Sequence, residues 1–194
     1  MKLRIANISR QTKETNIYLK LNLDGDGNSN IYTGIGFLDH MVTLFCFHSG
    51  VDMELNCVGD LDVDDHHTTE DVGIAIGKAL LESLGEKIGI NRYGSSYIPM
   101  DETLARVVID FSGRPYLVYN ARLERERVGT MDTQNIKEFF KALSSEAKMN
   151  CHMEVLYGDN DHHKIEALFK AFGRAVKQAI EVNSTKLPST KGLL

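Results

Sequence analysis

A pair of adjacent histidines followed by a glutamate occurs twice in this chain, and the repeat constrains the fold more than any other feature. The first copy is His66-His67-Thr68-Thr69-Glu70, and the second is His162-His163-Lys164-Ile165-Glu166. An apolar run at helical spacing follows each copy, so each pair lies at the start of a predicted helix. Either histidine of a pair can share a helix face with its glutamate, because residues three and four apart are neighbours on a helix.

The spacing of these residues predicts metal binding. A single histidine is usually a structural residue, but two copies of the same pattern favour ligation, since imidazole and carboxylate both bind divalent transition metals. The two rings of one pair diverge by roughly 100° around a helix, so we expect two ions, one for each imidazole. A further histidine, His40, also lies near the start of a predicted helix.

The remaining pattern divides the chain into two similar halves. In the first half we predict strands at 3–9, 16–23, 30–33 and 51–58, with helices at 36–47 and from 66 to about 87. In the second half we predict strands at 97–100, 103–111, 115–120 and 149–157, with helices at 133–148 and 162–182. We interpret 16–23 with 30–33, and 103–111 with 115–120, as hairpins.

This order predicts an internal duplication. Each half would contain a hairpin, a helix, a strand and a metal-binding helix, which together make a pseudo-twofold α+β unit with sheets on one side and helices on the other. We expect a single domain over 1–194, with repeats at about 1–90 and 91–184 and a short functional tail at 185–194.

Composition excludes several classes of partner. A net charge of −5 gives no electrostatic case for nucleic acid. No stretch approaches the ~18 apolar residues of a membrane span, and the N-terminus lacks an apolar signal core, so we expect a cytoplasmic protein without a membrane partner. Cys46, Cys57 and Cys151 lie within apolar patterns and are predicted to be reduced structural thiols. His48 and His152 match neither pair and are predicted to be structural.

Several short motifs together carry a resemblance to a known family. They are Arg10-Gln11-Thr12-Lys13-Glu14-Thr15, Gly36-Phe37-Leu38-Asp39-His40-Met41, Asp65-His66-His67-Thr68-Thr69-Glu70-Asp71, Ser112-Gly113-Arg114-Pro115, His162-His163-Lys164-Ile165-Glu166-Ala167 and Pro188-Ser189-Thr190-Lys191-Gly192. From about residue 8 to residue 193 the chain resembles the imidazoleglycerol-phosphate dehydratases of histidine biosynthesis, in their single-function form. The resemblance implies a hydro-lyase with two Mn²⁺ per subunit and a homo-oligomer of 24 subunits built from trimers.

The resemblance also implies roles for individual residues. The implied metal ligands are His40, His66, His67, Glu70, Glu138, His162, His163 and Glu166. Glu138 is a departure, because some family members carry a histidine before the Phe-Phe pair. The implied substrate contacts are Glu14, His40, Arg92, Arg114, Lys170, Ser189, Thr190 and Lys191. On spacing alone, Glu14, the two arginines and Lys170 fit ordinary surface charges better than binding residues.

The implied reaction converts D-erythro-imidazole glycerol phosphate to imidazole acetol phosphate and water. Its obstacle is a C–H bond with no carbonyl beside it. We expect a metal-bound imidazolate to expel the neighbouring hydroxyl and form a diazafulvene. Glu14 is then the favoured proton-transfer group, with a metal-bound water as the alternative. Two other classes of protein also fit the histidine pairs. A dinuclear metallohydrolase would use a bridging water as nucleophile, and a structural or storage assembly would need no anion-binding arginines or lysines.

Overall fold

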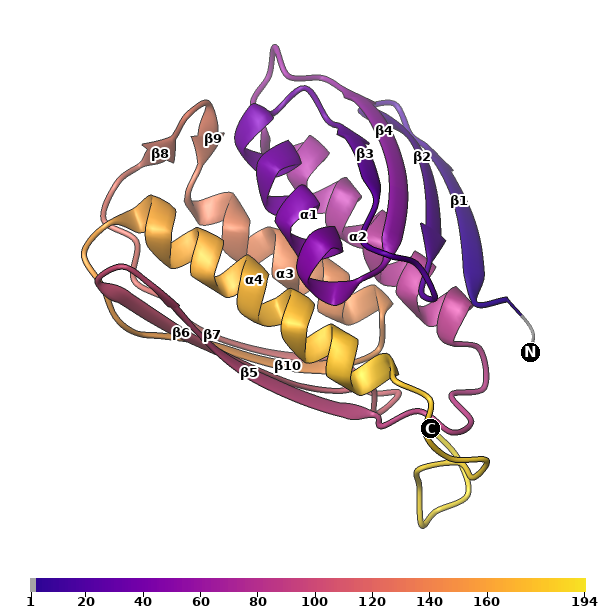
Figure 1. The fold of residues 1–194 in the computed structure, drawn as a ribbon. Coiled ribbons are helices and arrows are strands. Elements are labelled where there is room, and N and C mark those ends of the chain that lie inside the picture. Colours follow the sequence, from indigo (N-terminus) through magenta and orange to yellow (C-terminus); the bar gives the residue numbers. More distant parts are fainter. Residues whose placement is uncertain (1–2) are drawn as a thin grey trace.

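Two four-stranded sheets form the outer layers of the molecule, and four long helices lie between them (Figure 1). The computed structural model describes residues 3–194. The strand order is β1-β2-β4-β3 in the first sheet and β5-β6-β10-β7 in the second. The first half of the chain supplies one sheet with α1 and α2, and the second half supplies the other sheet with α3 and α4.

The two halves repeat the same order of elements. The first half contains β1 (Ile5–Gln11), β2 (Thr15–Asn22), β3 (Ser29–Tyr32), α1 (Gly36–Ser49), β4 (Asp52–Gly59) and α2 (His66–Leu84). The second half contains β5 (Tyr93–Met100), β6 (Thr103–Asp110), β7 (Tyr116–Asn120), β8 (Arg127–Val128), β9 (Met131–Asp132), α3 (Gln134–Glu146), β10 (Asn150–Tyr157) and α4 (Asp161–Ile180). The short β8–β9 ribbon has no counterpart in the first half and was not predicted.

The predicted α+β class and internal duplication are confirmed. Within each half the sheet covers one side of its two helices, and the two halves stack with their helices inward, so the two sheets lie on opposite outer sides (Figure 1). Inward positions alternate along β2, where Ile17, Leu19 and Leu21 are buried. The helix α1 ends at Ser49, and its C-cap Gly50 is in a left-handed conformation with φ 77°.

The two predicted hairpins are wrong, because β2 does not pair with β3 and β6 does not pair with β7. The strand β3 pairs in parallel with β4, and β7 pairs in parallel with β10. The true hairpins are β1–β2 and β5–β6, which are antiparallel and joined by short loops. A parallel pair needs a crossover, and α1 and α3 provide it. The turn residues at 24–28 indicate a reversal of the chain but do not select the strand that pairs next.

Each histidine-bearing helix packs against the first helix of the opposite half. The contacting pairs are α2 with α3 and α4 with α1. A glycine permits each close approach, since a β-carbon at Gly77 would lie 2.5 Å from the Leu143 carbonyl oxygen and one at Gly173 would lie 2.9 Å from the Phe45 carbonyl oxygen. Residues from both halves therefore meet at each helix pair.

The three cysteines are free and buried. Burial raises the pKa of the Cys46 and Cys57 thiols to about 12 and also raises the pKa of Cys151. At about pH 8 the thiolate fraction of such a group is only about 10⁻⁴, so we expect the native protein to resist alkylation, whereas the denatured protein should react at all three positions. Intact-mass measurement after timed labelling checks this. Equal labelling rates in the two states would contradict it.

No helix within residues 3–194 combines the length and apolar content that crossing a membrane requires.

Candidate functional site

His40, His162 and Glu166 form a cluster at the start of α4. His162 Nε2 lies 3.0 Å from Glu166 Oε2, and His40 Nε2 lies 3.4 Å from the same oxygen. Within residues 3–194 these are the one group of metal-type side chains whose ligand atoms all lie within 4.8 Å of one another. His40 comes from α1 and the other two come from α4, so both halves contribute.

Lys170 lies beside this cluster, one turn further along α4. Its Nζ is 2.6 Å from Glu166 Oε1. Burial raises the pKa of Glu166, but hydrogen bonds from Lys170 and His162 outweigh that effect and hold the pKa below its ordinary value. Glu166 is therefore a buried carboxylate with one oxygen facing a cation and the other facing two imidazoles.

His67 contacts two carboxylates at the start of α2. Its Nδ1 is 3.0 Å from Asp60 Oδ2, and its Nε2 is 3.8 Å from Glu14 Oε1. Glu14 lies in the β1–β2 loop and is exposed. The hydrogen bond to Asp60 raises the pKa of His67 above its ordinary value.

His163 has a matching environment at the start of α4. Its Nδ1 is 2.8 Å from Glu102 Oε2, and its Nε2 is 3.9 Å from Asp101 Oδ2. Asp101 and Glu102 form the β5–β6 loop, which is the counterpart of the loop that carries Glu14. The hydrogen bond to Glu102 raises the pKa of His163.

The remaining predicted ligands lie at the α2–α3 contact. His66 Nδ1 is 3.0 Å from the side-chain oxygen of Asn135. Glu138 accepts a hydrogen bond from Lys141 Nζ at 2.8 Å and contacts none of the histidines. By the duplication, Glu138 on α3 corresponds to His40 on α1, and Glu70 corresponds to Glu166. The ligand atoms of His66, Glu70 and Glu138 do not all lie within 4.8 Å of one another, whereas those of their counterparts His162, Glu166 and His40 do.

Five of the predicted substrate residues lie at the end of the molecule opposite the two histidine pairs. They are Arg92, Arg114, Ser189, Thr190 and Lys191. Arg92 donates from Nε to Asp110 at 2.6 Å and from Nη1 to the Pro188 carbonyl at 2.9 Å, which fastens the tail. Gly113 lies against the backbone of Leu194, so the tail ends beside the loop that carries Arg114.

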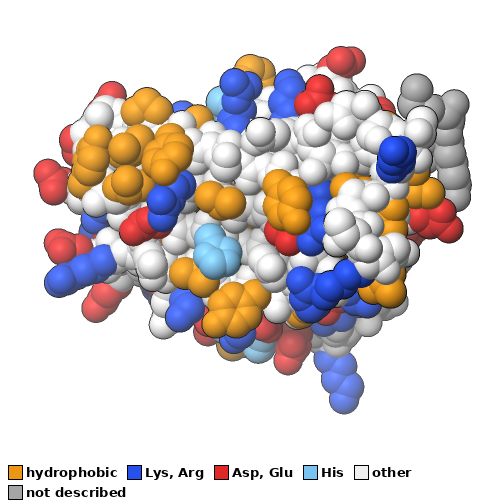
Figure 2. All heavy atoms as spheres, turned by 90° about the horizontal axis from the view of Figure 1, so that it is seen from below, with side chains coloured by type: hydrophobic (Ala, Val, Ile, Leu, Met, Phe, Trp, Pro, Cys, Tyr) orange, Lys and Arg blue, Asp and Glu red, His pale blue; other side chains and the backbone are white. Residues whose placement is uncertain are grey.

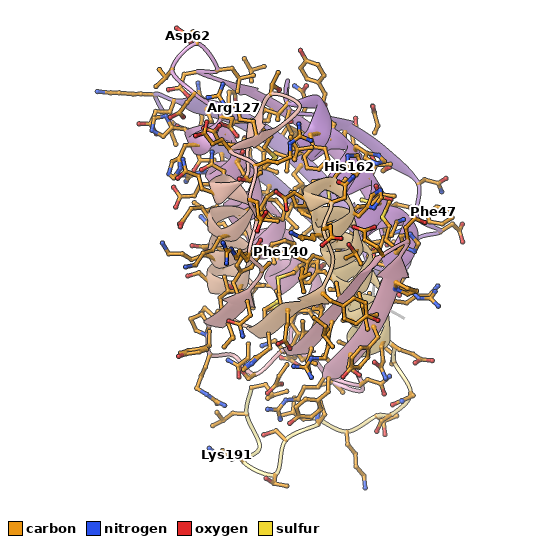
Figure 3. The ribbon with its side chains drawn as sticks, turned by 90° about the vertical axis from the view of Figure 1, so that its left-hand side faces the viewer. Phe47, Asp62, Arg127, Phe140, His162 and Lys191 are labelled. Atoms are coloured by element: carbon orange, nitrogen blue, oxygen red, sulfur yellow. The ribbon has the colours of Figure 1, made fainter. Side chains whose placement is uncertain are left out.

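The length of α4 separates this set from the histidines. The Arg92 backbone N–H donates to the Ala179 carbonyl in the last turn of α4, whereas His162 is in the first turn. At 1.5 Å per residue the two ends are about 25 Å apart. Figure 3 shows His162 and Lys191 at opposite ends. The structure therefore brings Glu14, His40 and Lys170 to the histidine end and the other five to the tail end.

Sequence reasoning missed the residues that hold the histidine rings. These are Asp60, Asp101, Glu102 and Asn135. Glu102 could have been found by superposing the halves, because Glu14 precedes Thr15 at the start of β2 as Glu102 precedes Thr103 at the start of β6. His48 and His152, predicted to be structural, lie outside the cluster; His48 stacks edge-on against Phe47, and His152 is exposed on β10.

The donor set suits a divalent transition metal. Three ligand atoms of the required types converge at His40, His162 and Glu166. His66, His67 and His163 each direct Nδ1 to a side-chain oxygen, which leaves Nε2 for a ligand. Mixed imidazole and carboxylate donors fit manganese as well as zinc or iron. Fold and site thus define a duplicated α+β protein with the donors of a candidate dinuclear metal centre.

The chain belongs to the imidazoleglycerol-phosphate dehydratase family, whose members are hydro-lyases. The model of that family matches residues 33–176. An imidazoleglycerol-phosphate dehydratase from an Exiguobacterium species is 56% identical, with 98% of each chain covered. One from Clostridioides difficile is 53% identical, with 99% of this chain and 100% of that protein covered.

Solved structures agree with this assignment. The imidazoleglycerol-phosphate dehydratase of Staphylococcus aureus has a TM-score of 0.84 at 48% identity, with 92% of this chain and 99% of that chain covered. A Pyrococcus furiosus protein of the same kind, solved in complex with (S)-C348, has a TM-score of 0.84 at 36% identity, with 96% and 100% covered. The predicted family and enzyme class are confirmed.

Proposed function

We propose that this chain dehydrates imidazole glycerol phosphate to imidazole acetol phosphate in histidine biosynthesis, with two Mn²⁺ per subunit. The observation that carries the proposal is the convergence of His40, His162 and Glu166 in a chain of this family. The two histidine pairs supply the other imidazoles. The reaction breaks one C–H and one C–O bond, releases water, and leaves an enol that becomes the ketone, so it needs no oxidant.

Two sets of residues would hold the ions. One contains His40, His162 and Glu166, and the other contains the corresponding His66, Glu70 and Glu138. His67 and His163 would each add one further imidazole. When bound, the ions supply Lewis acidity to the imidazole ring of the substrate, which favours departure of the neighbouring hydroxyl. Lys170 would stabilise the charge of Glu166 and hold its second oxygen.

Glu14 is the residue we propose for proton transfer. Its carboxylate is exposed, accepts no side-chain hydrogen bond in residues 3–194, and lies 3.8 Å from His67 Nε2. A carboxylate beside the histidine end is positioned to take the C–H proton once the substrate ring is held there.

On this proposal the arginines and the tail of a different subunit would hold the phosphate. Three carbon atoms join the imidazole to the phosphate, and they cannot span the roughly 25 Å between the histidine end and the tail end of one chain. Arg92, Arg114 and Lys191 of one subunit would therefore meet the histidines of another. Arginine would hold the phosphate by paired N–H donors and lysine as a point charge.

The outer sheet faces support assembly. Figure 2 shows hydrophobic side chains on the face seen from below. On the outer side of the second sheet Tyr97, Val108 and Tyr116 are 55%, 40% and 64% exposed. Apolar side chains exposed on one sheet face are candidates for burial between subunits. They are consistent with the proposed 24-subunit particle built from trimers.

Product analysis tests the function. Purified protein with added Mn²⁺ is given imidazole glycerol phosphate, and the mixture is followed by ³¹P NMR and mass spectrometry. We expect loss of one water with the phosphate ester retained. Release of inorganic phosphate would identify a metallohydrolase instead, and binding without either product would leave a storage or structural protein.

Arg114→Lys should weaken substrate binding, because lysine keeps the charge but loses the paired donors of the guanidinium. We expect the KM to rise by about 10-fold, which corresponds to about 1.4 kcal/mol, with a smaller change in kcat and weaker inhibition by inorganic phosphate. Steady-state kinetics measure both. Lys186→Arg, an exposed residue ahead of the tail motif, is the control. An unaltered KM and unaltered inhibition would make Arg114 an ordinary surface residue.

A further inference from the structure

Two histidines from different pairs have the same arrangement of carboxylates although the carboxylates come from different places. His67 Nδ1 faces Asp60, which follows β4, at 3.0 Å. His163 Nδ1 faces Glu102, which precedes β6, at 2.8 Å. The position corresponding to Asp60 in the second half is Asp159, but the carboxylates within 4.0 Å of the His163 ring nitrogens are those of Asp101 and Glu102. The two halves therefore place a carboxylate against Nδ1 of the second histidine of each pair, but from positions that do not correspond in the duplication.

The arrangement determines which ring nitrogen carries the proton. A carboxylate only accepts hydrogen bonds, so the facing Nδ1 of a neutral ring must be the donor. A neutral imidazole has one N–H, so Nε2 is then left with its lone pair outward. Nε2 is the atom that His67 and His163 offer to a ligand. Without the carboxylate a neutral ring populates both tautomers, and one of them blocks this atom.

We infer that Asp60 and Glu102 are positioning residues that fix His67 and His163 as Nδ1–H tautomers with Nε2 free to bind a divalent cation. The inference rests on the proposed function for the identity of that cation. Neither carboxylate is one of the proposed metal ligands, and each contacts only the Nδ1 side of one of them. Each acts through one histidine, and the two histidines belong to different pairs.

Glu102 also fixes the position of the helix that carries His163. Its Oε1 accepts the backbone N–H of Asn160 at 2.8 Å and that of Asp159 at 3.2 Å. The Asn160 side chain in turn caps α4 by accepting from the backbone N–H of His162 at 2.9 Å. One carboxylate thus joins the β5–β6 loop to the helix start and to the ring. Among the described residues, the hydrogen bonds of the Asp60 side chain go to the His67 ring alone. Substitutions at Asp60 and at Glu102 therefore give independent tests.

The tautomer can be measured without any assay of turnover. The full-length protein is labelled with ¹⁵N-histidine and freed of metal. Because the pKa of both rings is raised, long-range ¹H–¹⁵N spectra are recorded at about pH 9.5, some three units above the ordinary histidine pKa, so that the rings are neutral. We expect Nδ1 of His67 and His163 to be the protonated nitrogen. In Asp60→Asn and Glu102→Gln the signal of the affected ring should move toward a mixture of tautomers, because a carboxamide presents either an oxygen or an N–H. Protonation at Nε2 in the wild-type protein would overturn the inference.

Metal affinity provides the second readout. Titration of metal-free protein with Mn²⁺ should show about 10–100-fold weaker binding for Asp60→Asn and for Glu102→Gln. Asp60→Glu and Glu102→Asp keep the carboxylate and should recover part of the lost affinity. A merely structural role for Asp60 and Glu102 would not predict this recovery. Glu82→Gln, an exposed change on α2, is the control. Unchanged affinity in both variants would overturn the inference. If the wild-type protein binds no Mn²⁺ while its tautomers are as expected, the proposed function fails and the positioning role stands.

Discussion

Replacing His66 or His163 by alanine should abolish turnover. Each change removes an imidazole for which no neighbouring side chain can substitute: His66 is held by Asn135 at the α2–α3 contact, and His163 is held by Glu102. Loss of a metal ligand costs more than loss of a residue that orients it, which is typically 10–100-fold, so we expect a fall of more than about 100-fold. Initial rates with added Mn²⁺ measure it.

His48→Ala is the matched control for these variants. His48 is also a helix histidine, but it contacts Phe47 and lies outside the cluster. Its rate should stay near that of the wild type. If either His66→Ala or His163→Ala retains more than about a tenth of the wild-type rate, the assignment of both pairs as ligands is wrong.

Glu14→Gln should lower kcat by about 10²–10⁴-fold while leaving KM nearly unchanged. Glutamine keeps the size of the side chain and can still form hydrogen bonds, but it cannot accept a proton. Because Glu14 is exposed in the β1–β2 loop, its replacement should not disturb folding, so a folding defect would not explain such a fall in kcat.

The division between kcat and KM decides the role of Glu14. Steady-state kinetics with Mn²⁺ give both parameters, and circular dichroism checks the fold. Glu82→Gln serves as the control, since it makes the same chemical change at an exposed helix position. An unchanged kcat with a raised KM would make Glu14 a binding residue.

The sequence predicts most of the elements because their periodicity is strong. The alternation in β2 and the apolar runs of α1, α2 and α4 each lead to the observed element. Pairing of β3 and β7 could not be obtained in this way, because local turn chemistry does not report which strand a crossover reaches. The observed order of strand, helix and strand at β3-α1-β4 and β7-α3-β10 was the signal for a parallel pair.

The sequence predicts which types of residue form the candidate site, but not which of these residues lie together in space. The His-His-x-x-Glu spacing identifies the two helices that carry histidines. It does not show that each of these helices packs on the opposite half, which is why His40 joins Glu166 rather than Glu70. That grouping depends on contacts across the molecule at Gly77 and Gly173. The orienting residues Asp60 and Glu102 were missed because their roles arise only when loops from separate strands meet the helix starts.

Both the metal proposal and the separation of the two ends lead to sites shared between subunits. A neighbouring subunit would supply the missing donors at each cluster and bring the tail residues to the histidines. Metal-binding free energy would then contribute to assembly. The two halves bury a common core of helices and sheets within one chain, so a subunit should keep its fold when the metal is removed.

Sedimentation velocity with and without a chelator, combined with circular dichroism on the same samples, tests this claim most directly. We expect the Mn²⁺-loaded protein to sediment as a large particle and the chelated protein as a much smaller species, a trimer, with its secondary structure intact. Adding Mn²⁺ back should restore the large particle, and lowering the pH through the histidine range should also dissociate it, because protonated imidazole cannot bind a metal. A chelated particle that stays at full size would contradict the account, since its metal sites would lie within single subunits, and a chelated protein that loses its secondary structure would show instead that the ions hold the fold.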